Sequence, residues 1–186
     1  MTIAEQLDLT FIREDLRMKA LKAWTERDLL GVLILMESEC RIHFVLDNIK
    51  PLSSVGLFED ALLDAYTGCQ TNWHFVDKHI IYFLFKRADR KRLLSKGSPL
   101  PGNAPFVVYR GVSGVGAKRR VRGISWTADY EKAEWFAKRY NLQKPAVFKA
   151  VVPIENVYTY WERRQEQEFL CDITNEIKLK RYDIKS

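Results

Sequence analysis

The stretch Gln165-Glu166-Gln167-Glu168-Phe169-Leu170, written QEQEFL, places two carboxylates two positions apart and leads into an apolar run that ends at Ile173. The apolar run predicts a strand that enters a core. Side chains two positions apart on a strand project from the same face, so we expect Glu166 and Glu168 to share one cleft. Like charges held close together raise at least one pKa, an arrangement typical of functional sites. For this stretch alone, the solvated rim of an edge strand is the alternative interpretation.

Length and composition indicate one folded domain. With 186 residues, 47% of them hydrophobic, the chain is long enough for a sizeable core and too short for two full-sized domains. No apolar run approaches the roughly 20 residues that cross a bilayer, and the N-terminus lacks the pattern of a secretion signal. We therefore expect a cytoplasmic protein with no membrane partner. Cys40, Cys69 and Cys171 are too scattered for a disulfide framework or a zinc site, so free thiols are expected.

Positive charge is concentrated in the second part of the chain. The net charge is +6; residues 101–186 hold 16 Lys or Arg and 10 Asp or Glu, whereas residues 1–100 hold 14 of each kind. A basic half indicates a phosphate-bearing partner. A basic surface that serves only solubility is the alternative, because charge alone says nothing about chemistry.

The first part of the chain has the pattern of helices. Apolar positions repeat at helical spacing over residues 3–24 and from Thr71 onward, in a helix that ends in the basic stretch 86–96. Thr25 and Asp28 resemble a capping box that opens a further helix. We expect that helix to reach about residue 49 with an interruption near 37–39, followed by a turn at 51–56 and a short helix at 57–66.

After the turn-rich linker 97–105, the pattern changes to short strands. The expected strands are 106–110, 121–127, 146–152, 157–160, 166–173 and 176–184. A helix at 129–140 interrupts them, with Thr127 as its N-cap. Helices first and strands later predict an α+β fold, with a mainly helical part at 1–98 and a mainly β part at 105–186.

The glycine-rich stretch 111–120 is not a phosphate-binding loop of the nucleotide-triphosphate kind. In that motif a lysine follows the second glycine directly and a Ser or Thr follows the lysine. Here Ala117 separates Gly116 from Lys118, and Arg119 comes next. A mobile turn with a basic tip is the better interpretation.

Three short motifs lie in order on the predicted strands: Tyr109-Arg110-Gly111, Ser125-Trp126-Thr127 and Glu166-Gln167-Glu168. Their order and spacing resemble the arginine, serine, glutamate class of mono-ADP-ribosyltransferases, the branch that includes cholera-like toxins. The resemblance covers residues 106–173, and the helix Ala133-Glu134-Trp135-Phe136-Ala137 is also typical of it. The middle motif departs from the usual Ser-Thr-Ser but keeps the first serine. The resemblance implies a helical region packed on a split β-sheet core, with NAD as substrate and no metal.

The resemblance also implies a role for each motif residue. Arg110 would anchor the pyrophosphate of NAD, and Gly111 would let the backbone approach the nicotinamide amide. Glu168 would hold the ribose 2′-hydroxyl and face the oxocarbenium-like cation, and Ser125 would orient Glu168. Glu166 would contact the acceptor and take its proton. Trp126 and Thr127 complete the expected NAD-binding set. For the rings of Trp126 and Trp135, core packing is the favoured interpretation over stacking on nicotinamide.

The acceptor of ADP-ribose stays open at this stage. Within the resemblance, a glutamate at position 166 accompanies arginine acceptors, which favours a protein target. The basic residues Lys118, Arg119, Arg120 and Arg122 would instead attract phosphate. The aromatic residues Tyr160 and Trp161, just before the acidic motif, are suited to stacking on a base or packing on a protein. RNA, DNA and protein arginine are therefore all considered as acceptors.

The habit of the family indicates a bacterial toxin that acts inside the cell, in a toxin–antitoxin or phage-defence system, with an antitoxin as a further partner. Two other functions are considered. One is an NAD glycohydrolase that passes ADP-ribose to water. The other is a catalytically inactive nucleic-acid-binding module on the same fold.

Overall fold

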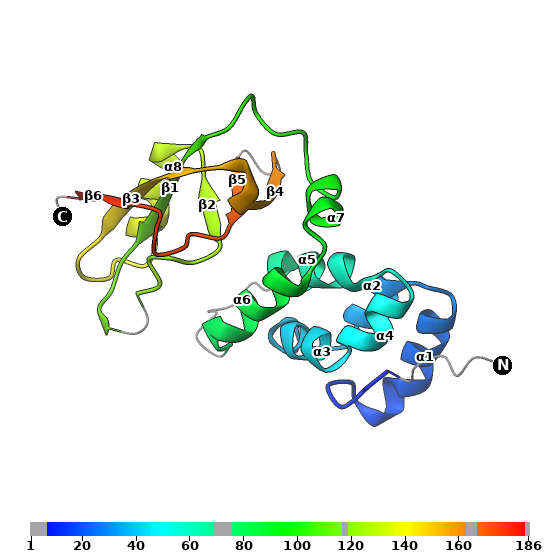
Figure 1. The fold of residues 1–186 in the computed structure, drawn as a ribbon. Helices are drawn as coiled ribbons and strands as arrows, with labels where there is room; N and C mark the ends of the chain where they lie inside the picture. The colour runs from blue at the N-terminus through cyan, green and yellow to red at the C-terminus, as the bar shows by residue number, and fades with distance from the viewer. Residues whose placement is uncertain (1–6, 69–75, 117–118, 163–166, 185–186) are drawn as a thin grey trace. The chain divides into compact units, whose positions relative to one another are not determined.

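The computed structural model describes residues 7–68, 76–116, 119–162 and 167–184. The chain forms two compact units, Met1–Asp89 and Arg90–Ser186. In the described residues, the first unit contains only helices and the second holds all the strands (Figure 1). The protein is thus a mixture of helices and antiparallel sheet, which confirms the predicted α+β class.

The first unit is built from short helices. They are η1 (Glu14–Leu16), α1 (Arg17–Thr25), α2 (Leu29–Leu33), η2 (Ser38–Cys40), α3 (Arg41–Asp47), α4 (Ile49–Ser54), α5 (Phe58–Gly68) and α6 (Lys78–Arg87). The predicted interruption near residues 37–39 is confirmed by the break before η2. Apolar side chains that are completely buried form the core of this unit, among them Val32, Phe44, Leu52, Leu62 and Leu84.

Two sequence predictions for the first unit need correction. Asp28 is the N-cap of α2, because its carboxylate accepts a hydrogen bond of 2.8 Å from the N–H of Gly31, whereas Thr25 ends the preceding helix. The turn predicted at residues 51–56 is wrong over most of its length, because α4 includes Pro51. A proline is tolerated in the first turn of a helix, where its missing N–H would have no intrahelical partner.

Among its described residues, the second unit contains helices and a six-stranded sheet. The elements are α7 (Arg90–Ser95), β1 (Phe106–Val112), β2 (Ser125–Thr127), α8 (Tyr130–Lys138), β3 (Ala146–Val152), η5 (Ile154–Asn156), β4 (Val157–Trp161), β5 (Glu168–Cys171) and β6 (Lys180–Asp183). The strand order is β4-β5-β2-β1-β3-β6, and all neighbouring strands are antiparallel. The prediction is accurate for β1, β3 and β4, whereas β2, β5 and β6 are shorter than predicted.

The sheet consists of two three-stranded halves joined at one pair of residues. β1 and β3 pair along their whole length, from Phe106 opposite Val152 to Val112 opposite Ala146. By contrast, β1 and β2 share only the pair Tyr109 and Thr127. The backbone ladder between the halves β4-β5-β2 and β1-β3-β6 therefore ends at this pair.

One face of the sheet carries the core of the second unit, and α8 covers part of the other face. Trp126 belongs to the core and is 2% exposed, which confirms the packing alternative for this residue. α8 lies so close to β1 that a Cβ atom at Gly111 would be 1.8 Å from the carbonyl oxygen of Ala133. The N-cap of α8 is Asp129 and not Thr127, because the Asp129 carboxylate accepts the N–H groups of the first turn. Thr127 instead accepts the N–H of Asp129 through Oγ1, at 3.0 Å.

Within the described part of the chain, no helix has the length and apolar character needed to cross a membrane. The same residues contain no group of three or more His, Cys, Asp or Glu side chains arranged to hold a metal ion. Cys171 is buried and Cys40 is half-buried, and both are free thiols, while Cys69 lies outside the described residues. Burial raises the pKa of both described thiols, with nearby carboxylates adding to the effect.

Candidate active site

Strands β2 and β5 bring Ser125 and Glu168 together. The register places Thr127 opposite Glu168 and Ser125 opposite Leu170, so Ser125 and Glu168 are diagonal neighbours on one face of the sheet. Ser125 Oγ donates a hydrogen bond of 2.5 Å to Glu168 Oε1, a length typical of a hydroxyl bound to a carboxylate. Both residues are half-buried. The bond fixes the direction of the carboxylate while leaving the pair accessible to solvent.

Arg110 reaches the backbone of Ser125 from β1. Its Nη1 donates to the backbone carbonyl of Ser125, and its Nε donates at 3.1 Å to the backbone carbonyl of Arg120. Because the backbone ladder between β1 and β2 ends one residue earlier, at Tyr109, the arginine side chain continues the connection between these strands. The guanidinium contacts the main chain of Ser125, whereas the Ser125 hydroxyl serves Glu168.

Gly123 supplies the space in which the Arg110 guanidinium lies. A Cβ atom at this position would be 2.5 Å from Arg110 Nη2 and 2.6 Å from Cζ. Any larger residue here must displace the guanidinium. Sequence reasoning missed Gly123; the only signal was a glycine two positions before the serine motif.

The other residues of the predicted NAD-binding set, Gly111, Trp126 and Thr127, pack within the protein itself. Gly111 is explained by the close approach of α8. Trp126 lies in the core and its Nε1 donates to the Gly123 carbonyl at 2.7 Å, so its ring is not accessible for contact with a ligand. Thr127 is 6% exposed. Among the described motif residues proposed to bind NAD, Arg110, Ser125 and Glu168 have partly accessible side chains.

The strand predicted to carry both Glu166 and Glu168 is shorter than expected. β5 begins at Glu168, and Gln167 has a φ of 44°, in the left-handed region. The alternation of a strand therefore does not extend beyond Glu168 toward the N-terminus. Glu166 itself lies outside the described residues, as does Lys118.

Arg119 and Arg122 of the basic stretch donate hydrogen bonds to backbone carbonyls of the protein itself. Arg122 donates to three backbone carbonyls of the segment before β6: Nη1 to Ile173 at 3.3 Å and to Thr174, and Nη2 to Ile177 at 3.2 Å. Arg119 Nη1 donates to the Gly114 carbonyl at 3.1 Å. The guanidinium of Arg122 thus holds this segment in place, and binding of an acceptor phosphate by Arg122 stays a prediction. Arg120 is half-buried, and its carbonyl serves Arg110.

The aromatic pair expected in an acceptor loop belongs to a buried strand instead. Tyr160 and Trp161 end β4 and are 3% and 6% exposed. The Tyr160 ring packs on Phe169 with 4.6 Å between centroids. Burial, helped by the charge of Glu162, raises the pKa of Tyr160. Neither ring is placed to stack on a base.

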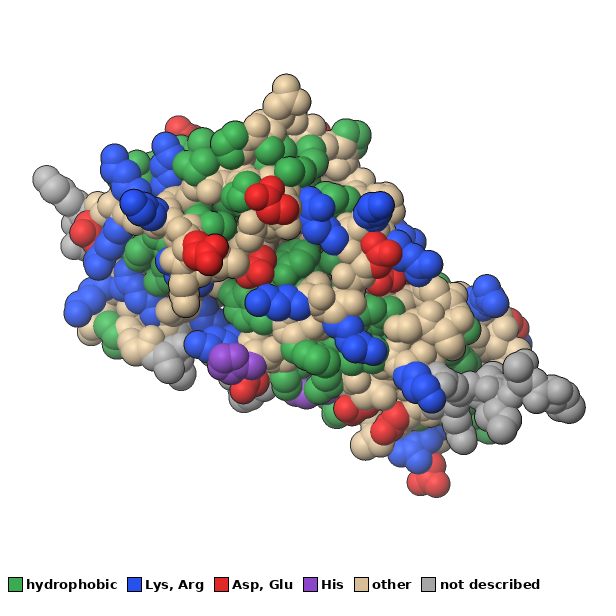
Figure 2. Space-filling model, in the orientation of Figure 1, with side chains coloured by type: hydrophobic (Ala, Val, Ile, Leu, Met, Phe, Trp, Pro, Cys, Tyr) green, Lys and Arg blue, Asp and Glu red, His purple; other side chains and the backbone are tan. Residues whose placement is uncertain are grey.

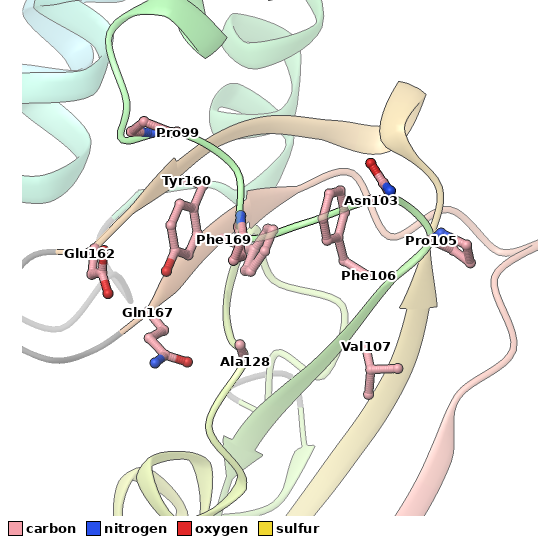
Figure 3. A pocket seen from close by; sticks show the side chains of 11 residues that line it. Pro99, Asn103, Pro105, Phe106, Val107, Ala128, Tyr160, Glu162, Gln167 and Phe169 are labelled. Carbon is pink, nitrogen blue, oxygen red and sulfur yellow. The ribbon is translucent and has the colours of Figure 1, made fainter.

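Two hollows lie beside this site. The first, of about 370 Å³, has the rings of Phe106, Tyr160 and Phe169 on one side, and Glu162 and Gln167 lie at one end of it (Figure 3). The second, of about 570 Å³, is lined by Asp129, Glu131, Lys132, Trp135, Glu162 and Gln167. Both hollows thus reach the residue that precedes Glu168. Arg110, Ser125 and Glu168 line neither of them.

Comparisons with models of known protein families, with curated proteins and with solved structures found no match to this chain. The function is therefore argued from the motif residues and their geometry. The contacts among Arg110, Ser125 and Glu168 are the part of that geometry with the clearest chemical meaning.

Proposed function

We propose that this protein is an ADP-ribosyltransferase that cleaves NAD and transfers ADP-ribose to a macromolecular acceptor. The observation that carries the proposal is the convergence of Arg110, Ser125 and Glu168 from three strands, through the Ser125–Glu168 hydrogen bond of 2.5 Å and the bond from Arg110 to the Ser125 carbonyl. These partners are 15 and 43 positions apart in the sequence. They meet because of the strand pairing and not because they are neighbours in the chain.

Glu168 supplies the main chemical function in this proposal. Departure of nicotinamide leaves positive charge on the ribose C1′ atom, and a fixed carboxylate in a partly desolvated site stabilises that charge. Ser125 holds Oε1 and so orients the carboxylate that the proposal assigns to the ribose. The carboxylate needs no reorganisation during the reaction, because the hydrogen bond has already set its direction.

Arg110 is the proposed contact for the pyrophosphate. A guanidinium carries five N–H donors in one plane, and the bonds to the Ser125 and Arg120 carbonyls fix that plane. A guanidinium of fixed orientation suits two-point recognition of phosphate oxygens. The arginine therefore combines a structural role at the joint of the sheet with the proposed role in binding NAD.

The form of the sheet also supports the proposal. A sheet of two halves joined at the single pair Tyr109 and Thr127 agrees with the split core that the resemblance implies. Glu166 remains the proposed acceptor contact and proton acceptor. A role as an intracellular toxin controlled by an antitoxin is the biological setting that the family habit favours.

The experiment that tests this function incubates the protein with labelled NAD and cell extract. Released nicotinamide is measured, and the label is then separated by its sensitivity to protease and to nuclease. Label on a macromolecule supports the transferase. Free ADP-ribose without labelled macromolecule indicates an NAD glycohydrolase, and intact NAD indicates a catalytically inactive module.

A further inference from the structure

Part of the sheet face that carries Ser125 and Glu168 is not covered by α8. Opposite residues on antiparallel strands share a face, and the register of β1, β3 and β6 places seven side chains on the face of Tyr109. Val147 is one of them and is completely buried, whereas the other six are half-buried or exposed. We call these six the tyrosine–lysine face: Val107, Tyr109, Lys149, Val151, Lys180 and Tyr182. Val107 is 41% exposed and Val151 is 49% exposed, so this end of the face is open to solvent.

Tyrosine rings form a continuous row on this face. Tyr130, the first residue of α8, lies edge-to-face against Tyr109 at 5.5 Å and against Tyr182 at 6.0 Å between ring centroids. Tyr130 is 37% exposed, and Tyr109 and Tyr182 are half-buried. Rings that are held in place and partly exposed can each offer a surface for stacking at little cost in conformational entropy.

Two lysines face each other across β3 and β6. Lys149 lies directly opposite Lys180, and none of the six residues of the tyrosine–lysine face is acidic. Like charges directly opposite each other destabilise a sheet. Neither lysine has an ion-pair partner among the described residues, and Lys180 Nζ instead lies 5.1 Å from the Tyr182 ring. An anion bound between the two ammonium groups would relieve the repulsion.

The basic character extends over the neighbouring surface. Lys and Arg side chains are numerous on the side of the molecule where β3 and β6 lie (Figure 2). The face is also continuous with the candidate site. Tyr109 lies opposite Thr127, and Thr127 lies opposite Glu168.

We propose that the tyrosine–lysine face binds single-stranded nucleic acid, and that this strand is the acceptor of ADP-ribose. Bases stack on the row of tyrosines, and phosphates lie near Lys149 and Lys180. Proteins generally bind single strands through aromatic rings that stack on bases and cations that contact phosphates. The lysine pair favours a phosphate-bearing ligand over an apolar protein segment packed on Val107 and Val151. The acceptor part of this inference rests on the proposed function; the binding part does not.

Transfer joins one atom of the strand to the ribose of NAD and releases nicotinamide. A nucleophilic oxygen or nitrogen of the strand forms a bond to the ribose C1′ atom of NAD. The bond from C1′ to the nicotinamide nitrogen breaks, and its electron pair leaves with neutral nicotinamide. The proton of the nucleophile passes to a general base, for which Glu166 is proposed. The products are the ADP-ribosylated strand, nicotinamide and one proton.

The test measures fluorescence anisotropy of labelled single-stranded RNA and DNA, each about 12 nucleotides long, with the full chain. Tyr182→Leu and the double variant Lys149→Gln/Lys180→Gln should each weaken binding by roughly tenfold. In the double variant, the slope of the binding constant against salt concentration should also fall by an amount that corresponds to about two phosphate contacts. Both variants should keep the urea unfolding transition of the parent, which shows that they fold, and also its nicotinamide release.

Arg181→Gln is the matched control for the single variant Lys180→Gln. Arg181 is on the same strand but faces the other way, opposite Phe148, and pairs with Asp183 at 2.5 Å. Its substitution should leave binding unchanged within about twofold, as expected for a charge outside the contact. Equal weakening by both substitutions would overturn the inference, because the loss would then reflect net charge and not this face.

The outcomes separate the two proposals. Failure of the parent protein to bind either probe, together with Glu168-dependent transfer of label to protein, would overturn the tyrosine–lysine face and keep the proposed function. Probe binding that depends on the face, in a protein that leaves NAD intact, would refute the proposed function and the acceptor role but keep the binding surface.

Discussion

Ser125 and Glu168, 43 positions apart in the chain, are joined by a hydrogen bond of 2.5 Å from Ser125 Oγ to Glu168 Oε1. The bond crosses diagonally between β2 and β5, so it depends on the register that places Thr127 opposite Glu168. A slip of one residue would turn Glu168 to the opposite face of the sheet. The position of the proposed catalytic carboxylate is therefore a property of the strand pairing.

Ser125→Ala should lower the rate of nicotinamide release from NAD by roughly 10- to 100-fold, because a hydrogen bond to a charged group contributes about 1.5–3 kcal/mol. Ser125→Thr keeps a hydroxyl and should retain more of the activity than the alanine variant. Steady-state release of nicotinamide measures both. A rate in the alanine variant equal to that of the parent would show that Ser125 does not orient the carboxylate.

Gly123→Ala should raise KM for NAD more than it lowers kcat, because the new methyl group would lie 2.5 Å from Arg110 Nη2 and displace the guanidinium. Arg110→Lys should have a similar effect, since lysine cannot offer the planar donor set. If Gly123 acts only through Arg110, the double variant should lose little more than Arg110→Lys alone. Losses that simply add would refute this positioning role.

Arg122→Gln should destabilise the second unit by about 2 kcal/mol, because it removes charge-assisted hydrogen bonds to the carbonyls of the segment before β6. Urea unfolding measures the change, and the exposed Arg181→Gln serves as a control with an expected change within about 0.5 kcal/mol. An Arg122 variant of unchanged stability that transfers ADP-ribose poorly would support the acceptor-binding role predicted from the sequence.

Glu166→Ala should separate the two half-reactions. If Glu166 serves the acceptor, transfer to a macromolecule should fall much further than the slow hydrolysis of NAD does, because water needs less assistance from an acceptor site. Labelled NAD reports both quantities in one reaction. Equal loss of both activities would place Glu166 in the NAD site.

The sequence predicted those strands whose pattern follows from local burial. β3 is an example, since its predicted limits, 146–152, agree with the structure. The start of β2 at Ser125 was not predictable, because the residue before it that matters, Gly123, leaves space for the guanidinium of Arg110 from another strand, a contact that local sequence does not reveal. Register likewise depends on tertiary pairing, so the contact between Ser125 and Glu168 could be expected only by resemblance.

Trp135 of α8 lies outside the core, contrary to the core packing predicted for it. Large apolar side chains on a helix are normally buried, yet Trp135 is 53% exposed. α8 packs through Ala133 and Ala137, whose small side chains let the helix backbone approach Gly111 closely. Tyr160 differs from its prediction in the opposite direction. It was expected in an accessible loop, yet it lies on β4, an edge strand of the sheet whose side chains are buried on both faces.

The rate of nicotinamide release by Glu168→Gln tests the central claim most directly. The substitution keeps the shape of the side chain but removes the charge that faces the ribose cation. Glu155→Gln is the control, since Glu155 is an exposed carboxylate on η5, outside the site. We predict a loss of about 100-fold or more for Glu168→Gln, with an unchanged unfolding transition and no loss in the control. Activity of Glu168→Gln within about tenfold of the parent would contradict the account, because a carboxylate that stabilises the transition state cannot be replaced by a neutral amide at so small a cost.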